Sequence, residues 1–160
     1  MSPIKSTNGI DWRFVPFSAL TTQELYEILQ LRSEVFVVEQ ACPFQDMDGA
    51  DQKAMHLLGV KEGRLVAYAR CFAAGEKFAE ASIGRVVTHM SARGGGIGHV
   101  LMKEAVASLA RHWGMQPIRI GAQARLEKFY NQHGFVQNGQ PYIEDGIPHI
   151  EMLRVARPIA

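Results

Sequence analysis

The N-terminal part of the chain changes from the period of a strand to the spacing of a helix. Residues 11–17, DWRFVPF, are rich in aromatic and β-branched side chains, and they predict a strand that ends near Pro16. Thr21 and Glu24 have the spacing of a capping box, and apolar side chains then recur every three or four positions. We therefore expect a helix over about 22–37.

The middle of the chain consists of short apolar runs separated by turn residues. Residues 39–54 are polar and turn-rich and predict an irregular segment. The apolar runs 56–60 and 64–72 flank Lys-Glu-Gly, which predicts a hairpin. Residues 81–88, ASIGRVVT, are typical of a further strand.

The C-terminal half alternates helix and strand patterns. An amphipathic pattern predicts a helix over about 96–112, and 117–122 reads PIRIGA, which predicts a strand. A strand, a helix and a strand in this order imply a parallel pair with a right-handed crossover. A second helix over about 123–133 would end with Gly134 as its C-cap.

A closing antiparallel hairpin is expected around the Asp145-Gly146 turn. No repeat, linker or low-complexity tract divides the sequence, so residues 1–160 are interpreted as a single domain. The predicted fold is α+β, with a mixed sheet of six or seven strands and a central parallel pair flanked by helices.

Composition narrows the classes of function. The net charge of +1 gives no basic excess to neutralise phosphates, which argues against nucleic acid as a partner. The N-terminus lacks the apolar region of a secretory signal, and no apolar run is long enough for a membrane span. Cys42 and Cys71 form no CxxC pair and are expected to be reduced thiols. We therefore expect a cytoplasmic protein without a membrane partner.

The sequence RGGGIG at 93–98 lies between the predicted strand 81–88 and the following helix. The start of a helix offers unpaired amides and a positive dipole end, both of which attract anions. Glycines let a phosphate oxygen approach these amides, and an arginine adds a fixed cation. A P-loop would need a lysine that is absent, and a dinucleotide fingerprint would need glycine where His99 stands.

The pattern R-x-x-G-x-G formed by Arg93, Gly96 and Gly98 resembles the pyrophosphate loop of the GNAT superfamily of acyl-CoA N-acyltransferases. The segment 121–135, GAQARLEKFYNQHGF, is similar to a second element of that superfamily. Together with 31–51 and 144–152, it resembles the ElaA family over nearly the whole chain. The resemblance implies a GNAT fold, acetyl-CoA as acyl donor and an amine as acceptor.

The resemblance also implies roles for individual residues. Backbone groups of Val86, Val87 and Thr88 would face the pantetheine arm and the thioester. The loop residues Arg93, Gly94, Gly95, Gly96, Ile97 and Gly98 would hold the pyrophosphate. The amide side chain of Gln123 would contact pantetheine. Tyr130 matches the general acid of the superfamily.

The chemistry of amine acetylation independently requires a proton donor for the leaving thiolate and an acceptor for the proton of the amine. A phenol can supply the first proton, and we expect Tyr130 and Gln123, seven positions apart, to share one helical face. Five side chains are candidates for the general base: Glu34, Glu39, Asp48, His56 and His149. We favour Glu39, which follows the apolar run VFVV, over His149, which opens the last predicted strand.

Two metal interpretations are weak. The segment DMDGAD at 46–51 lacks the glycine position and closing glutamate of an EF-hand, so Asx-turns are expected, and the six histidines lack metal-ligand spacing. We therefore predict no metal.

Two alternative functions stay open. The pattern formed by Arg32, Val35, Phe36, Gln45, Asp48 and Asp51 resembles the acyl-homoserine-lactone synthases. A CoA-binding regulatory module without turnover is the other alternative. The identity of the amine acceptor is not encoded in any motif, and a homodimer is one arrangement that the sequence allows.

Overall fold

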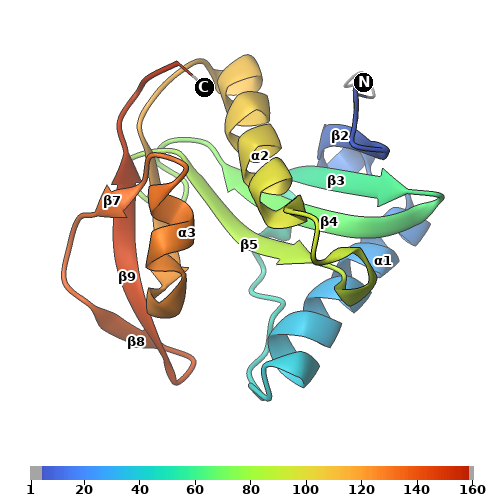
Figure 1. Ribbon diagram of the computed structural model, residues 1–160, viewed down its shortest axis with the longest axis horizontal. Coiled ribbons are helices and arrows are strands. Elements are labelled where there is room, and N and C mark those ends of the chain that lie inside the picture. The colour runs from blue at the N-terminus through green and yellow to red at the C-terminus, as the bar shows by residue number, and fades with distance from the viewer. Residues whose placement is uncertain (1–4, 159–160) are drawn as a thin grey trace.

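The computed structural model describes residues 5–158, which form two sheets and three α-helices (Figure 1). The strands are β1 Lys5–Thr7, β2 Ile10–Pro16, β3 Met55–Lys61, β4 Arg64–Phe72, β5 Ser82–Thr88, β6 Ile118–Gln123, β7 Val136–Gln137, β8 Tyr142–Glu144 and β9 Ile147–Arg154. The α-helices are α1 Thr22–Arg32, α2 Ile97–Trp113 and α3 Glu127–Asn131. Short 3₁₀ turns cover Phe17–Ala19, Asp51–Lys53, Met90–Ala92 and Ala124–Leu126, and a π-helix covers Ser33–Glu39.

The capping box predicted from the sequence begins α1. The Thr21 hydroxyl accepts the Glu24 amide at 3.0 Å, and the Glu24 carboxylate accepts the Thr21 amide at 2.9 Å. The predicted helix over 22–37 is confirmed as helical throughout, but α1 ends at Arg32 and residues 33–37 belong to the π-helix Ser33–Glu39. Hydrophobic spacing cannot separate these two forms, since π-helical turns occur as local widenings of an α-helix.

The single mixed sheet predicted from the sequence is divided into two sheets. Strands β1 to β5 form one antiparallel sheet in chain order, and β9 pairs with β6, β7 and β8 in the other. The expected parallel pair survives as one bridge between Ala81 and Ile118, where the Arg119 amide donates to the Ala81 carbonyl at 2.8 Å. Beyond this bridge β5 and β6 do not pair along their lengths, so an opening lies between their C-terminal ends.

Helices cover both faces of the first sheet (Figure 1). On one face α2 buries Leu101 and Ala105 against β4 and β5, as the amphipathic pattern predicts. On the opposite face α1 buries Ile28 and Leu31 against side chains such as Tyr68. The α+β class and the crossover through α2 are therefore confirmed, and the number and continuity of the sheets are corrected.

The second predicted helix is shorter than expected. Gln123 is the last residue of β6, a 3₁₀ turn follows, and α3 spans only Glu127–Asn131. Gly134 has φ +89°, and the Phe135 amide donates to the Tyr130 carbonyl at 3.2 Å, which confirms the C-cap predicted there. Within residues 5–158, none of the helices is both long and apolar enough to cross a membrane.

Candidate active site

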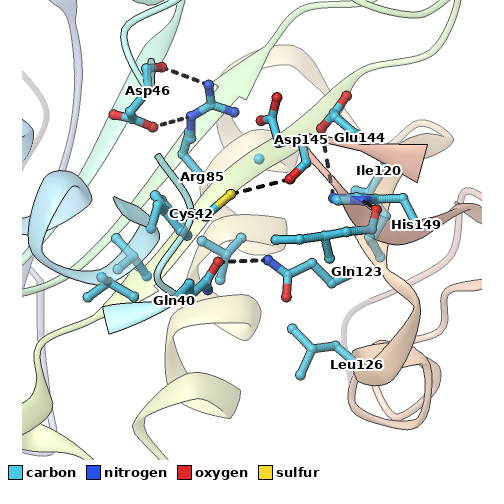
Figure 2. Close-up of a pocket in the computed structure, with 18 of the residues that line it drawn as sticks. Gln40, Cys42, Asp46, Arg85, Ile120, Gln123, Leu126, Glu144, Asp145 and His149 are labelled. Atoms are coloured by element: carbon cyan, nitrogen blue, oxygen red, sulfur yellow. Dashed lines mark hydrogen bonds and ion pairs between the residues drawn. The ribbon is translucent and has the colours of Figure 1, made fainter. Parts of the chain in front are cut away.

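A cavity of about 410 Å³ opens where β5 and β6 separate. The π-helix, β5, β6, α3 and the β8–β9 hairpin all contribute to its wall (Figure 2). Eight of the site residues predicted from the sequence line it: Glu39, Val86, Val87, Thr88, Arg93, Gln123, Tyr130 and His149. The remaining five, Gly94 to Gly98, continue from Arg93 beyond the lining and lead into α2.

The glycine-rich loop presents bare backbone at the start of α2. Gly94 and Gly96 have φ values of +100° and +76°, and a side chain at Gly94, Gly95 or Gly96 would meet only open space. At the start of α2, His99 and Val100 are the first residues whose amides donate to a preceding backbone carbonyl, and both donate to the carbonyl of Gly96. Among the described residues, amides 94–98 have no backbone acceptor, so they are available to an anion.

A β-bulge in β5 lies against the cavity. Opposite β4, Tyr68 pairs with Val87 and Arg70 pairs with Gly84, so Arg85 and Val86 together face Ala69. Arg85 has φ +49°, a left-handed conformation that is uncommon for residues other than glycine. A bulge leaves the backbone groups of its extra residue outside the ladder, which frees polar groups in the wall of the cavity. The sequence-based prediction of a regular strand over 81–88 missed this bulge, although an isolated glycine within a strand, here Gly84, often marks one.

Tyr130 lies on α3 and is only 8% exposed. Its ring packs edge-on against Phe129 and Phe135, with centroid distances of 5.1 and 6.1 Å. Burial raises the pKa of the Tyr130 phenol to about 12, so the hydroxyl keeps its proton throughout the neutral range. The structure thus has a neutral proton donor in the cavity wall.

Gln123 reaches the same cavity from β6, so the predicted shared helical face with Tyr130 is wrong although both side chains line one space. Its amide nitrogen donates to the Gln40 side-chain oxygen at 3.3 Å, and its oxygen accepts from Arg125 Nε at 3.0 Å. Gln123 therefore has its side-chain orientation fixed from two sides, and Figure 2 shows the contact with Gln40.

His149 stands opposite Gln123 in the β6–β9 ladder and is 8% exposed. Its Nδ1 lies 2.7 Å from the Ile147 carbonyl oxygen, which can only accept, so Nδ1 carries the proton. In the neutral ring Nε2 therefore carries the lone pair, and it lies 3.8 Å from the Glu144 carboxylate (Figure 2). Tyr142 stacks on the imidazole at 5.5 Å and fixes the ring plane.

Glu39 is the last residue of the π-helix and lines the cavity. Its carboxylate forms an ion pair with Arg93 at 2.8 Å, and Arg93 also donates to the Thr88 carbonyl at 2.9 Å. The lone pairs of Glu39 are therefore directed at a guanidinium, and each of the two side chains is 36% exposed.

The other three candidate bases have different roles. His56 is buried and hydrogen-bonded to the Tyr68 hydroxyl at 2.6 Å and the Asp51 carbonyl at 2.8 Å. Asp48 is held by Arg70, whose hydrogen bonds keep the pKa of that carboxyl well below its usual range. Glu34 lies 3.8 Å from His89 and does not line the cavity.

The segment with the EF-hand-like spacing forms a charge network that sequence reasoning missed. Asp48 accepts the Ala50 amide at 3.1 Å, which confirms an Asx-turn. Three aspartates of this segment also bind three arginines that come from α1, β4 and β5. The contacts are Arg32 with Asp46 at 2.7 Å and Asp51 at 2.8 Å, Arg70 with Asp48 and Asp51 at 2.8 Å, and Arg85 with Asp46 at 2.8 Å.

A signal for this network is present in the sequence. Arg32 continues the apolar spacing of the predicted helix, Arg70 stands in an otherwise apolar stretch, and in the structure they are 0% and 1% exposed. Buried arginines need anionic partners, which the aspartates after the helix can supply. The network fixes the irregular segment to the sheet beside the cavity. No group of three or more metal-ligating side chains was found within residues 5–158.

A model of the GNAT acetyltransferase domain matches residues 18–155. The chain belongs to the GNAT acyltransferases. Their fold implies binding of acyl-CoA. The family expected from the loop motif is thus confirmed.

Individual relatives support the same placement within the GNAT family. Protein ElaA of Escherichia coli is 44% identical over 147 residues, which cover 91% of this chain and 96% of ElaA. A crystal structure of an acyl-CoA N-acyltransferase from Pseudomonas aeruginosa is 44% identical, with a TM-score of 0.85 and coverage of 91% and 99%. A CoA-dependent acyl-homoserine lactone synthase, BjaI, has a TM-score of 0.74 at 18% identity, which shows a shared fold alone.

Proposed function

We propose that the protein transfers the acetyl group of acetyl-CoA to a primary amine by direct attack of the amine on the thioester. The observation that carries the proposal is the continuity of one cavity, which joins the anion-binding loop end to two buried proton-transfer groups, Tyr130 and His149. Donor and acceptor would be bound together there, so no acyl-enzyme intermediate is needed.

The donor is held through its polar groups. The amides of 94–98 and the Arg93 guanidinium hold the pyrophosphate, as the free donors of the loop support. Gln123 and the backbone of Val86, Val87 and Thr88 hold the pantetheine arm. The bulge at Arg85 directs free backbone groups toward the thioester carbonyl, where negative charge develops in the transition state.

The reaction breaks the C–S bond and forms a C–N bond. Tyr130 gives its phenolic proton to the sulfur as the bond breaks, and its burial beside the apolar wall favours the neutral phenol. The same apolar surroundings disfavour a thiolate, so protonation of the leaving group is required more strongly there than in water.

The proton of the amine goes to His149 in this proposal, in preference to Glu39. The Nδ1–H bond to Ile147 leaves the Nε2 lone pair of His149 in the cavity, whereas the Glu39 carboxylate is engaged by Arg93. His149 to Ala should then lower kcat with little change in the Kd of acetyl-CoA. Glu39→Gln should leave kcat within about a factor of five, the range that loss of an exposed ion pair allows.

The test is an assay of CoA thiol release with acetyl-CoA and a panel of amines: peptide N-termini, lysine derivatives, polyamines and aminoglycosides. Amine-dependent thiol release, lost in His149→Ala, supports the proposal. Tight CoA binding without release from any amine would contradict it and favour a regulatory CoA-binding module. Full activity of His149→Ala together with an inactive Glu39→Gln would exclude His149 as the general base and assign that role to Glu39.

A further inference from the structure

Residues 39–42 cross the cavity and contact three different parts of its wall. Glu39 pairs with Arg93 at 2.8 Å, next to the glycine-rich loop. Gln40 accepts from the Gln123 amide at 3.3 Å, and the Cys42 thiol donates to the Asp145 carbonyl at 3.3 Å in the β8–β9 turn (Figure 2). We call residues 39–42 the strap.

Two of these three partners are groups that the proposed function assigns to acyl-CoA. The Glu39 carboxylate occupies the guanidinium that would bind a phosphate oxygen, since both anions fit the same fork of donors. The Gln40 oxygen accepts from the Gln123 amide as a pantetheine carbonyl would. Adjacent residues of the strap thus present an anion and an amide oxygen, the two kinds of acceptor that a CoA molecule presents.

The backbone of the strap is hydrogen-bonded to the π-helix, because the amides of residues 40, 41 and 42 donate to carbonyls of residues 35–38. Ala41 has a φ of +49°, a left-handed conformation that is costly for a residue other than glycine. Val38, just before the strap, is 72% exposed, so apolar burial anchors this part of the chain weakly. The backbone hydrogen bonds are local to residues 35–42, so the strap is held against the cavity wall by the side-chain contacts of Glu39, Gln40 and Cys42.

We propose that the strap occupies the polar partners of acyl-CoA in the free protein, and that the ligand displaces Glu39 from Arg93 and Gln40 from Gln123 as it binds. This inference rests on the proposed function, because it uses the same ligand and the same contacts. In this model Glu39 and Gln40 compete with the ligand for the groups that bind it. Their contacts oppose binding, and the free energy of breaking them is subtracted from the affinity.

The first experiment measures the Kd of CoA by calorimetry. Glu39→Gln and Gln40→Ala should each bind CoA about two- to five-fold more tightly than the wild type, the ratio expected for loss of a half-exposed polar contact. Arg93→Ala should bind more weakly. Glu62→Gln, at the β3–β4 turn, removes the same charge from a residue that does not line the cavity, and it should bind as the wild type does.

The direction in which the Kd of CoA changes in each variant tests the displacement model separately from the proposed function. Unchanged or weaker CoA binding in both Glu39→Gln and Gln40→Ala would overturn the displacement model while leaving the proposed function intact. Absence of CoA binding by the wild type would overturn the displacement model and the proposed function together. An equal gain in Glu62→Gln would show a general charge effect and would also overturn the model for Glu39.

The second experiment uses Cys42 as a reporter in the free protein. The sequence has two cysteines, and Cys71 is 0% exposed, so iodoacetamide should modify Cys42 alone. Release of the strap in Glu39→Gln or Gln40→Ala should speed this modification about two- to five-fold, in proportion to the population of the open strap. Mass spectrometry of the two peptides separates strap release from unfolding, in which Cys71 also reacts. Wild-type rates in both variants would contradict the model.

Discussion

Replacing Tyr130 by Phe removes one oxygen from a side chain that is 8% exposed. The ring keeps its edge-on contacts with Phe129 and Phe135, at centroid distances of 5.1 and 6.1 Å, so the change leaves no cavity in the apolar wall. We therefore expect Tyr130→Phe to fold normally and to bind acetyl-CoA with nearly wild-type affinity. What the variant loses is the proton that the proposed mechanism delivers to the thiolate.

The expected loss of rate follows from the value of general acid catalysis. A positioned acid contributes roughly 10²–10⁴ in rate, which corresponds to about 3–5 kcal/mol of activation free energy. Because burial raises the pKa of Tyr130 to about 12, the wild-type phenol remains protonated to about pH 11. Loss of the Tyr130 proton should therefore produce no alkaline decline of kcat below that pH.

The assay compares kcat and the Kd of acetyl-CoA for the wild type, Tyr130→Phe and Tyr26→Phe, whose ring is 70% exposed on α1. An acyl donor with a more acidic thiol should recover part of the rate lost in Tyr130→Phe, because its thiolate needs less protonation. Equal slowing with both donors would show that the hydroxyl positions substrate. Wild-type kcat in Tyr130→Phe would refute the reasoning altogether.

Two further predictions concern the glycine-rich loop and His133, whose Nε2 lies 2.9 Å from Nδ1 of His99 on α2. Gly96→Val should raise the Kd of CoA, measured by calorimetry, at least about ten-fold, because a branched side chain there covers the free amides. The control is Gly75→Val, at a glycine with a φ of +88° in open space, which should leave the Kd unchanged. Burial and the neighbouring His99 lower the pKa of His133 to about 4, so between about pH 6.5 and pH 4 the unfolded state binds a proton that the native state does not. The free energy of unfolding, measured in urea, should therefore fall on acidification through this window, and His133→Gln should flatten that dependence; an unchanged slope would contradict it.

The features that the sequence predicted well have local causes. The capping box, the C-cap at Gly134 and the turn at Asp145-Gly146 each depend on a few adjacent residues with special hydrogen bonds or a left-handed backbone. The glycine-rich loop is of the same kind, because bare backbone at a helix start follows from the glycines themselves. These signals located one end of the candidate site.

The features that the sequence did not reveal depend on contacts between distant segments. The separation of β5 from β6 depends on how two sheets pack, and hydrophobic periodicity is the same for paired and separated strands. The bulge is formed by Arg85, whose side chain binds Asp46 from a segment far away in the chain. In the same way, the ion pair of Glu39 with Arg93 could not be inferred from the apolar run before Glu39.

The charge network illustrates why residue type alone gave an incomplete answer. The sequence predicted Asx-turns for the aspartates at 46–51, and Asp48 forms one. The main partners of these aspartates are nevertheless arginines buried in α1 and β4. Assigning those pairs requires knowing which face of each element is covered, which is a property of the tertiary structure.

In the proposed reaction, acetyl-CoA and an amine meet in the cavity between the two sheets, and the acetyl group passes directly from the thioester sulfur to the amine nitrogen. The most direct measurement is the stoichiometry of product, with acetylated amine quantified by mass spectrometry against CoA thiol released from isotopically labelled acetyl-CoA. We predict one acetylated amine for each CoA released, and a fall of roughly 10²–10⁴ in the rate of formation of both products in Tyr130→Phe. CoA released with free acetate, or no CoA released with any amine, would contradict it.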